Sequence, residues 1–235
     1  IGPHVLHIVN SSIVSCTFPD TWKLAKVVPL HKSGAKDEPS NFRPISILPV
    51  LSKVCEKVVC TQLSAYLARC HILAPSQYAY RAGHSTEDAL NDAVEWITRR
   101  VDDGDVAAVT SIDLSRAFDS VDHDVLLTKL CWYGIDVGWF RSYLSGRRQV
   151  VRGGSLSLPL SHGVPQGSLV GPILFSIFTN DLPSYLPHGR LVSYTNDTQL
   201  LDSAHPTNLP ILKARQEDTL RAVLSFFTSN SLKMN

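Results

Sequence analysis

Two aspartates that lie far apart in the sequence have the residue type and the setting of a metal site. Asp113 follows the β-branched and small apolar run 106–112, and Asp197 follows Asn196 in a pair of residues that suits a two-residue hairpin turn. A buried strand ending at residue 112 would fix the Asp113 carboxylate rigidly at the edge of its sheet. Hard cations such as Mg²⁺ bind through one or two carboxylates together with substrate phosphates. The pair therefore indicates a divalent-metal site, although each aspartate taken singly is also common at strand ends and in turns.

Strands, loops and amphipathic helices must position these two residues. The run 106–112 is predicted to be a buried strand, and 191–201 two short strands about Asn196-Asp197. A capping box at Ser85–Asp88 begins a predicted helix that ends near Gly104. The other predicted elements are a strand within 22–30, a polar loop over 31–41, helices over 50–67 and 122–130, a hairpin over 149–160 with a Gly153-Gly154 turn, a helix from Ser168 or Pro172 to about 180–181, and a helix over 216–227. Helices and strands interleave without a strict repeat and without a low-complexity linker, so the class is α+β or α/β.

The helix predicted over 50–67 is amphipathic. Its apolar face is predicted to comprise Val50, Leu51, Val54, Val58, Val59, Leu63 and Leu67, with Lys53, Lys57 and Gln62 turned outward.

Composition excludes several classes of protein. The chain has 235 residues, 44% hydrophobic and 18% charged, so it can bury a sizeable core and is not disordered, collagen-like or a coiled coil. Its longest nearly apolar run, 169–178, is far shorter than the roughly 20 residues of a bilayer-spanning helix. Five scattered cysteines without a C-x-x-C pair favour a reducing compartment over a disulfide framework or a zinc site. With no secretory signal and Met234 as the only methionine, we expect part of a longer polypeptide, cut at both ends.

Charge is arranged in blocks, although the net charge is only +1. Residues 20–81 hold nine basic and four acidic side chains, residues 87–136 hold four basic and twelve acidic ones, and residues 141–152 hold four arginines and no acid. Basic outer blocks could grip phosphate backbones while the acidic block holds cations. The same pattern also fits a mosaic of solvated faces, and charge alone leaves both interpretations open.

Six segments of the chain carry a more specific signal. Three include or lie between the two aspartates: Ile112-Asp113-Leu114-Ser115-Arg116-Ala117-Phe118-Asp119-Ser120-Val121-Asp122-His123, then Gly163–Ser168 running into Pro172–Phe175, then Tyr194-Thr195-Asn196-Asp197-Thr198. Three flank them: Asn41–Ser46, Gln77–Arg81 with His84–Thr86, and Leu232–Asn235. In order and spacing these segments closely resemble the blocks of reverse transcriptases of non-LTR retrotransposons. The resemblance covers nearly the whole chain from about Phe18.

The resemblance implies a fold, a reaction and partners. The implied fold is α+β, a right-hand polymerase with fingers over about residues 1–105 and a ferredoxin-like palm of antiparallel sheet and helices over about 106–235, and with the thumb and any endonuclease outside the chain. The implied reaction is attack of a primer 3′-hydroxyl on the α-phosphate of a deoxynucleotide, with two Mg²⁺ ions, or Mn²⁺ in their place, roughly 3.5 to 4 Å apart. An RNA template, a DNA primer and a dNTP are the implied partners, no membrane is implied, and the nucleus and cytoplasm are the implied location.

The resemblance also assigns roles to single residues. The catalytic positions would be Asp113, Asn196 and Asp197, and the metals would be held by Asp113, Asp197 and the backbone of Leu114. The nucleotide would meet Phe118 as a steric gate against the 2′-hydroxyl, Gln166 along its side, and Arg43 and Lys32 at the triphosphate. Template and primer would contact Arg81, Gly167, Arg147 and Arg148, with Arg141 and Arg152 as further candidates. Asp119, Asp122 and His123 are assigned to helix capping and local hydrogen bonding.

At one position the chain departs from the family pattern. The family has two aspartates after an aromatic and a variable residue, whereas this chain has Tyr194-Thr195-Asn196-Asp197. An amide oxygen carries no formal charge, so the site loses a unit of negative charge where the metals need it. We therefore expect a chain that folds as a reverse transcriptase but polymerises poorly or not at all.

Other functions remain open on the sequence alone. A non-catalytic nucleic-acid-binding relic would bind RNA without metal and without primer extension. An RNA-templated RNA polymerase shares the palm, but an aromatic gate at Phe118 argues against it. A hydrolase using Ser168 and His162 is the most remote alternative, because no G-x-S-x-G elbow surrounds Ser168.

Overall fold

The computed structural model describes residues 2–151, 153–154 and 156–235, and these form two compact units. Unit 1 comprises residues 1–66 and 121–174, and unit 2 comprises residues 67–120 and 175–235. Each unit is therefore built from two separate stretches of the chain. The division into fingers and palm at about residue 105 stays a prediction, since compactness alone does not test it. In the part of the chain that is described, no helix is long and apolar enough to cross a membrane.

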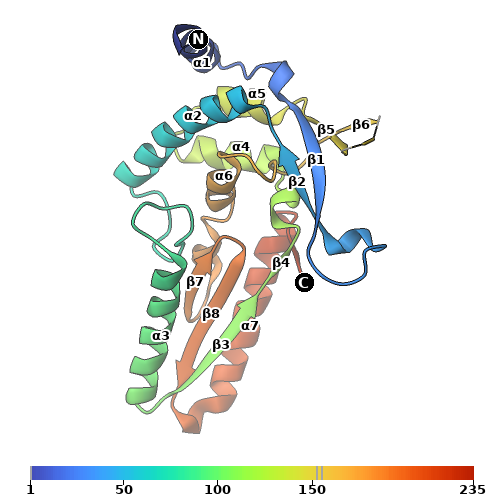
Figure 1. Ribbon diagram of the computed structural model, residues 1–235. Helices are drawn as coiled ribbons and strands as arrows, with labels where there is room; N and C mark the ends of the chain where they lie inside the picture. Colours follow the sequence, from blue (N-terminus) through green and yellow to red (C-terminus); the bar gives the residue numbers. More distant parts are fainter. Residues whose placement is uncertain (1, 152, 155) are drawn as a thin grey trace. The chain divides into compact units, whose positions relative to one another are not determined.

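Unit 1 combines a mixed sheet with helices (Figure 1). Its four-stranded sheet has the order β2-β1-β5-β6, with β1 and β5 parallel and the other neighbours antiparallel. The bounds are α1 Gly2–Val14, η1 Asp20–Trp22, β1 Leu24–His31, η2 Pro39–Asn41, β2 Phe42–Ile47, α2 Val50–Arg69, α4 His123–Trp132, α5 Gly138–Leu144, β5 Arg148–Val151, β6 Ser157–Pro159 and α6 Gly171–Phe178. Helices α2 and α6 each begin in unit 1 and end in unit 2. The hairpin predicted over 149–160 is confirmed, although its connection is longer than a Gly153-Gly154 turn.

Aromatic rings form much of the unit 1 core. The Phe18 ring meets the rings of Trp22, Trp139 and Tyr143 edge-on, with centroids 5.0 to 5.6 Å apart. Edge-to-face contacts of this kind stabilise a core beyond the area that they bury. Because Trp139 and Tyr143 both lie on α5, this short helix is held mainly by packing, which explains why no sequence periodicity predicts it.

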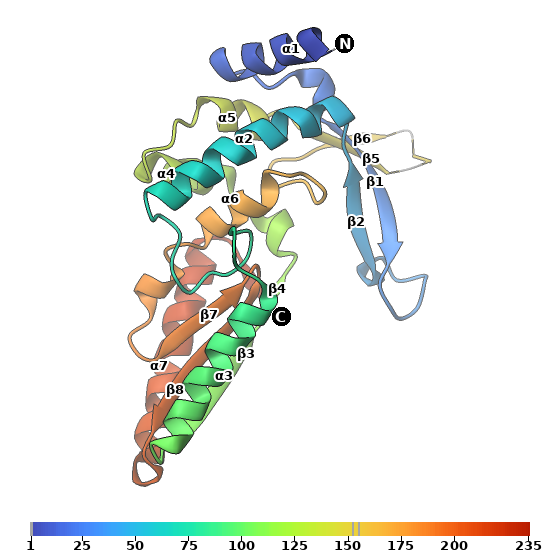
Figure 2. The ribbon, with the colours of Figure 1, turned by 60° about the vertical axis from the view of Figure 1, so that its left-hand side comes forward.

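Unit 2 is an antiparallel sheet between two helices (Figures 1 and 2). The sheet order is β3-β8-β7, and a separate short ladder joins β4 to β9. The bounds are α3 Thr86–Asp102, β3 Val106–Ile112, β4 Leu114–Ser115, η3 Ala117–Ser120, η4 Leu182–Tyr185, β7 Arg190–Tyr194, β8 Asp197–Ala204, η5 Pro206–Asn208, α7 Leu209–Ser229 and β9 Lys233–Met234. The predicted strand 106–112 is confirmed, and the α+β class with antiparallel pairing is confirmed as well.

The two helices pack on opposite faces of this sheet. Ala89 and Ala93 of α3 lie against Val192 and Leu201, which share one face by the register of β7 and β8. The predicted capping box starts α3: the Ser85 hydroxyl accepts the Asp88 N–H, and the Asp88 carboxylate accepts the Ser85 N–H at 2.7 Å. These hydrogen bonds hold the pKa of Asp88 below its usual value.

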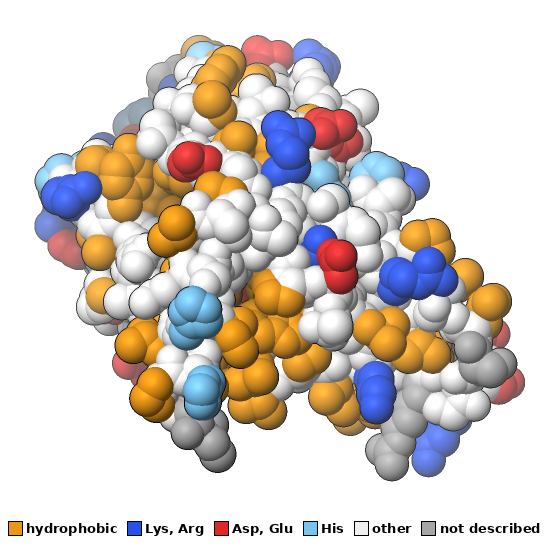
Figure 3. Space-filling model, turned by 90° about the horizontal axis from the view of Figure 1, so that it is seen from above, with side chains coloured by type: hydrophobic (Ala, Val, Ile, Leu, Met, Phe, Trp, Pro, Cys, Tyr) orange, Lys and Arg blue, Asp and Glu red, His pale blue; other side chains and the backbone are white. Residues whose placement is uncertain are grey.

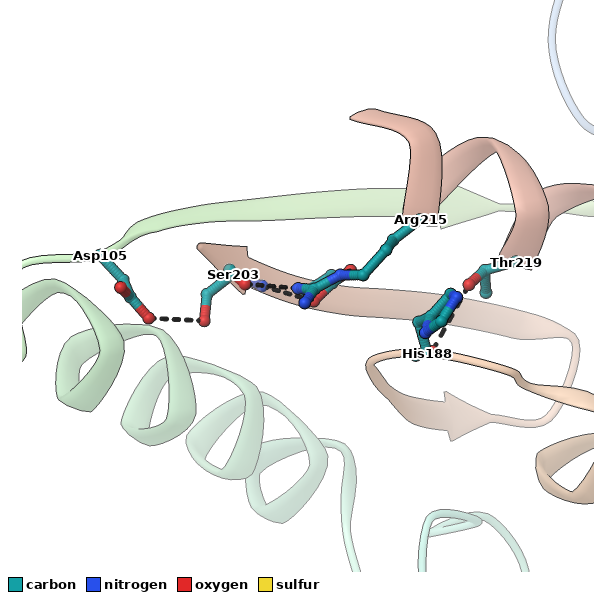
Figure 4. Close-up of polar contacts among 6 residues, drawn as sticks. Asp105, His188, Ser203, Arg215 and Thr219 are labelled. Atoms are coloured by element: carbon teal, nitrogen blue, oxygen red, sulfur yellow. Dashed lines mark hydrogen bonds and ion pairs between the residues drawn. The ribbon is translucent and has the colours of Figure 1, made fainter. Parts of the chain in front are cut away.

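Helix α7 is tied to the other face by polar contacts (Figure 4). The Arg215 guanidinium makes a two-pronged ion pair with Asp202 of β8, with Nε 3.0 Å from Oδ2. Nearby, the Ser203 hydroxyl donates to Asp105 at 3.0 Å, which fastens β8 to the connection between α3 and β3. Helix α7 begins at Leu209, seven residues before the predicted start, because Pro210 suits a first helical turn.

Candidate active site

The structure brings Asp113, Asn196 and Asp197 together at one end of the unit 2 sheet. Asp113 directly follows β3 and Asp197 opens β8, and the antiparallel register pairs Ile112 with Thr198. Both carboxylates are exposed. The Asn196 side-chain amide donates to Asp113 Oδ1 at 3.2 Å and to Asp197 Oδ1 at 3.3 Å. A single N–H₂ group therefore bridges the two carboxylates.

The hairpin turn lies one residue earlier than the sequence predicts. Tyr194 pairs with Asp197, so the two turn residues are Thr195 and Asn196 rather than Asn196 and Asp197. Thr195 has φ +61°, a conformation that β-branched residues rarely adopt. Strain of this kind persists only where the surroundings over-determine the backbone, and it clusters at functional sites. Because Asp197 is the first residue of β8, its carboxylate is placed by the sheet itself.

Gln77 supports this strained turn from the neighbouring loop. Its buried side-chain oxygen accepts the Thr195 N–H at 3.3 Å and the Ala79 N–H at 2.9 Å. The backbone beside it pairs with β7, since the Tyr78 N–H donates to the Ser193 carbonyl at 3.0 Å. The Gln77–Arg81 block thus supports the turn between β7 and β8.

Arg81, predicted to contact the template, is half-buried in the same loop. Its Nη1 donates to the carbonyls of Ala74 and Gln77 at 3.1 and 3.0 Å. Part of the guanidinium therefore stabilises the loop that carries Gln77. A contact between Arg81 and nucleic acid stays a prediction.

The closing block of the chain lies directly beside Asp113. Strand β9 pairs with β4, so Leu114 faces Met234 across the ladder. The Asn235 N–H donates to the Asp113 carbonyl at 3.0 Å, and its side-chain amide donates to Asp113 Oδ2. Asp113 thereby accepts amide hydrogen bonds on both carboxylate oxygens. The sequence pattern does not single out Asn235, although it lies in a block that carries the resemblance.

Phe118 lies in the short helix η3 that follows Asp113. It is half-buried, and its ring centroid lies 4.9 Å from that of Phe175. This contact fixes the ring without burying it, which is compatible with either core packing or a gate.

Gln166 lies in unit 1, on a loop whose backbone is held by β2. The Ser46 N–H donates to the Gln166 carbonyl at 2.8 Å. Gly167 has φ +113°, and a Cβ there would lie 2.6 Å from the Ser46 carbonyl oxygen. Glycine is required at position 167 because the loop there lies too close to the β2 backbone for a side chain.

Exposed cations share one face of the unit 1 sheet. Alternation along β1 puts Leu24, Lys26 and Leu30 on the same face, and the register places Arg148 beside Leu24 and Arg43 beside Leu30. Arg43, Lys26 and Arg148 are all exposed. Lys32 is also exposed, just beyond the end of β1. The sheet therefore presents positive charge suited to phosphate groups.

The prediction that Arg147 contacts nucleic acid is wrong in this structure. Its side chain is only 2% exposed, and its guanidinium lies 4.0 Å from the Tyr143 ring centroid. Arg147 directly precedes β5 and is buried, whereas Arg148, the first residue of β5, is exposed. Arg141 is exposed, and Arg152 lies outside the described residues.

Two other groups of residues are structural. The Asp122 carboxylate caps α4 by accepting the N–H groups of Asp124 and Val125 at 2.9 and 3.0 Å, as predicted. His123 Nε2 lies 2.8 Å from the Gly163 carbonyl, a contact between distant segments rather than a local one. The prediction for Asp119 stays a prediction.

The positions of Ser168 and His162 do not support the hydrolase alternative. Buried Ser168 accepts the Gly171 N–H at 3.0 Å with its hydroxyl oxygen, which caps the start of α6. His162 is exposed, and its Nδ1 lies 2.9 Å from the Ser161 hydroxyl. Ser168 therefore serves as a helix cap.

Unit 1 also has an apolar pocket of about 380 Å³. It is lined mainly by α1, α2 and α5, with Val59, Leu63 and Phe140 among its walls. Apolar side chains gather on the face that carries these helices (Figure 3). None of the residues predicted to form a site lines this pocket. Among the described residues, no group of three or more His, Cys, Asp or Glu side chains could hold a metal ion.

Comparisons with known proteins place the chain among polymerases. The family model "Reverse transcriptase (RNA-dependent DNA polymerase)" matches residues 30–235. The chain is 36% identical over 218 residues to a probable RNA-directed DNA polymerase from transposon BS of Drosophila melanogaster, which covers 86% of the chain and 24% of that protein. It is 30% identical over 213 residues to the RNA-directed DNA polymerase from mobile element jockey of the same species, covering 83% of the chain and 23% of that protein. The chain thus spans about a quarter of the length of these relatives.

Solved structures support the fold. The apo telomerase of Candida tropicalis, truncated from its C-terminal domain, superposes with a TM-score of 0.62 at 11% identity, covering 97% of this chain and 52% of that one. Telomerase from the same organism in complex with a fragment of telomeric RNA gives a TM-score of 0.63 at 12% identity, covering 91% and 40%. At this identity the likeness establishes the polymerase fold, with fingers and palm, and nothing finer.

Proposed function

The chain belongs to the reverse transcriptase family, and on that premise we propose that unit 2 carries the nucleotidyl-transfer site of an RNA-directed DNA polymerase. One observation carries the proposal. Asp113 and Asp197, 84 residues apart (197 − 113), have their carboxylates within hydrogen-bond reach of the same amide nitrogen. The antiparallel register of β3 and β8 sets this convergence, so the sheet itself places both carboxylates at one point.

The donor set fits a divalent cation. Reverse transcriptases in general use divalent metal ions, and two exposed carboxylates with an adjacent backbone carbonyl are ligands that Mg²⁺ and Mn²⁺ accept. We assign Asp113, Asp197 and the backbone of Leu114 as the groups that would hold two such ions. When bound, the ions would stabilise the attacking and leaving oxygens of an in-line displacement at phosphorus.

Asn196 makes this copy a poor polymerase. Its N–H₂ group occupies the space between the carboxylates as a hydrogen-bond donor, so a cation must displace it. An aspartate there would donate nothing, and repulsion among three carboxylates would be relieved by cations. Asparagine at position 196 thus reduces the negative charge of the site and, with it, the attraction of the site for a cation.

The remaining predicted residues have separate tasks in this proposal. Phe118, held by Phe175, would exclude a ribose 2′-hydroxyl and so select deoxynucleotides. Gln166 would line the nucleotide from its fixed loop, and Arg43 with Lys32 would neutralise the triphosphate. Arg148, on the same sheet face as Arg43, and Arg81 would contact the backbone of an RNA template or a DNA primer. The telomerase neighbour solved with telomeric RNA supports RNA as one partner of this fold.

Primer extension by the full-length protein tests the proposal. We expect Asn196→Asp to raise kcat for dNTP incorporation by roughly a hundredfold over the natural protein, because one charged ligand is restored where charge develops. Asp113→Asn in the Asn196→Asp background is the matched control and should remove the gain. Equal extension by the natural protein and Asn196→Asp would show that asparagine is tolerated and would contradict the proposed impairment.

A second candidate function follows from the same asparagine. A relic that binds nucleic acid without catalysis would keep the exposed cations Lys26, Arg43 and Arg148 and dispense with the third carboxylate. RNA binding that persists in EDTA, without extension even by Asn196→Asp, would favour it.

A further inference from the structure

Glu56 is a fully buried carboxylate outside the site described above. It lies on α2, where it is 0% exposed, and its Oε1 accepts the Ser52 hydroxyl at 2.8 Å. Its Oε2 accepts the N–H of Leu169 at 2.7 Å and that of Val170 at 3.4 Å. These two amides directly precede α6, so the carboxylate satisfies donors that the helix itself leaves unpaired.

The loop before these amides is held on its other side as well. The Ser46 N–H binds the Gln166 carbonyl, and Gly167 packs against the Ser46 carbonyl more closely than any side chain would allow. Glu56 therefore forms the second of two anchors, with β2 on one side of the loop and α2 on the other. Gln166 is held directly by the β2 anchor, and the Glu56 anchor holds the same loop a few residues further along, at Leu169 and Val170.

Arg147 is a second buried polar side chain of unit 1. Arg147 donates Nε to the Tyr143 carbonyl at 2.6 Å, and among the described residues its Nη1 and Nη2 have no hydrogen-bond partner. Burial raises the pKa of the Tyr143 hydroxyl, while Arg147 lowers it and Glu56 raises it, so both charges act on the same phenol. The arginine that was predicted to contact nucleic acid instead packs over the rings of Phe18 and Tyr143.

We propose that Glu56 is a positioning residue for the incoming nucleotide: its carboxylate fixes the loop that presents Gln166. This inference rests on the proposed function, because it takes Gln166 to line the nucleotide. It adds a residue on α2 that makes no contact with substrate and acts through the backbone of residues 169 and 170.

Hydrogen exchange tests the anchor without any activity measurement. In the full chain, Glu56→Gln should speed exchange at the Leu169 and Val170 amides by about tenfold, because a neutral amide oxygen accepts these N–H groups more weakly than a carboxylate oxygen does. Ser52→Ala is the matched control, since it removes only the partner of Oε1 and should leave these two amides protected. Glu56→Asp keeps a carboxylate but shortens its reach, so it too should expose these two amides, and it replaces Glu56→Gln if that variant fails to fold.

Nucleotide binding separates positioning from a purely structural role. The Kd of methylanthraniloyl-dATP with Mn²⁺ is measured for the Asn196→Asp protein with and without Glu56→Gln. We expect binding to weaken by about tenfold, while primer-template affinity stays within about twofold.

Each outcome decides the inference. Faster exchange together with weaker nucleotide binding supports it. Unchanged exchange at Leu169 and Val170, faster exchange with unchanged binding, or no nucleotide binding even with Glu56 present would each overturn it. Failure of the proposed function would be seen separately, as absence of primer extension by Asn196→Asp. The hydrogen-exchange result could still be interpreted in that case.

Discussion

The two carboxylate clusters of this molecule are built in opposite ways. At the hairpin of unit 2, Asp113 and Asp197 are exposed, and the sheet register alone sets where they lie. In unit 1, Glu56 is buried, and its own hydrogen bonds hold the loop around it. At the hairpin, the fold positions the carboxylates. In unit 1, the Glu56 side chain instead holds part of the fold in place. We therefore expect a substitution at the hairpin, such as Asn196→Asp, to change the chemistry with little effect on folding.

The largest expected effect on stability is at the buried cluster. Arg147→Ala should lower the free energy of unfolding by about 2–5 kcal/mol, because it removes a buried side chain that packs over the rings of Phe18 and Tyr143 and binds the Tyr143 carbonyl. The matched control is Arg148→Ala at the neighbouring exposed position, which should change stability by no more than about 0.5 kcal/mol. Urea unfolding of both variants measures the difference. Similar losses in the two variants would show that burial of Arg147 does not carry the effect.

A smaller loss is expected at the loop between the two anchors. Gly167→Ala places a Cβ against the Ser46 carbonyl and forces an L-residue to φ +113°, so it should cost about 1–3 kcal/mol and loosen the loop. Gly153→Ala is a control with positive φ but open space around it. If both variants unfold at the same urea concentration, the close approach to Ser46 contributes nothing.

The smallest effect on stability is expected at the hairpin. Without divalent ions, Asn196→Asp should lower the free energy of unfolding by about 0.5–1 kcal/mol, because an exposed donor is lost and a third carboxylate is added. Saturating Mg²⁺ should cancel this loss by binding the folded state. Thermal unfolding in EDTA and in Mg²⁺ measures both values. A loss as large as that of Arg147→Ala would break the contrast between the two clusters.

Much of unit 2 could be predicted because its signals are local. The run 106–112 is β-branched and ends at a charged residue, and Ser85 with Asp88 forms the capping box that the sequence indicates. The residues proposed for the metal site follow from the resemblance together with these elements. The turn is misplaced by one residue, because strand pairing forces Thr195 into a conformation that its type disfavours.

The buried polar cluster could not be predicted, because it depends on tertiary contacts. On α2 the sequence favours an apolar face through Val50, Leu51 and Val54, yet these are exposed, and the buried stripe runs through Ser52, Cys55, Glu56, Val59, Cys60, Leu63 and Leu67. The buried residues have the same helical spacing as the predicted face but lie partly on a different side of the helix. Because they include Glu56 and Ser52, a search for apolar residues alone does not find them all. Burial next to a carboxylate also raises the pKa of the Cys60 thiol to about 11, mainly through desolvation. Helix α1 likewise lacks the turn and capping signals on which sequence prediction relies.

Binding of Mn²⁺, followed by electron paramagnetic resonance, tests most directly whether the Asn196 amide stands where a cation belongs. The natural chain is titrated beside Asn196→Asp, with Asp113→Asn in each background to identify the site. The account predicts that Asn196→Asp binds Mn²⁺ on the order of tenfold more tightly and that Asp113→Asn removes this binding. Equal affinity in the natural chain and Asn196→Asp would contradict it.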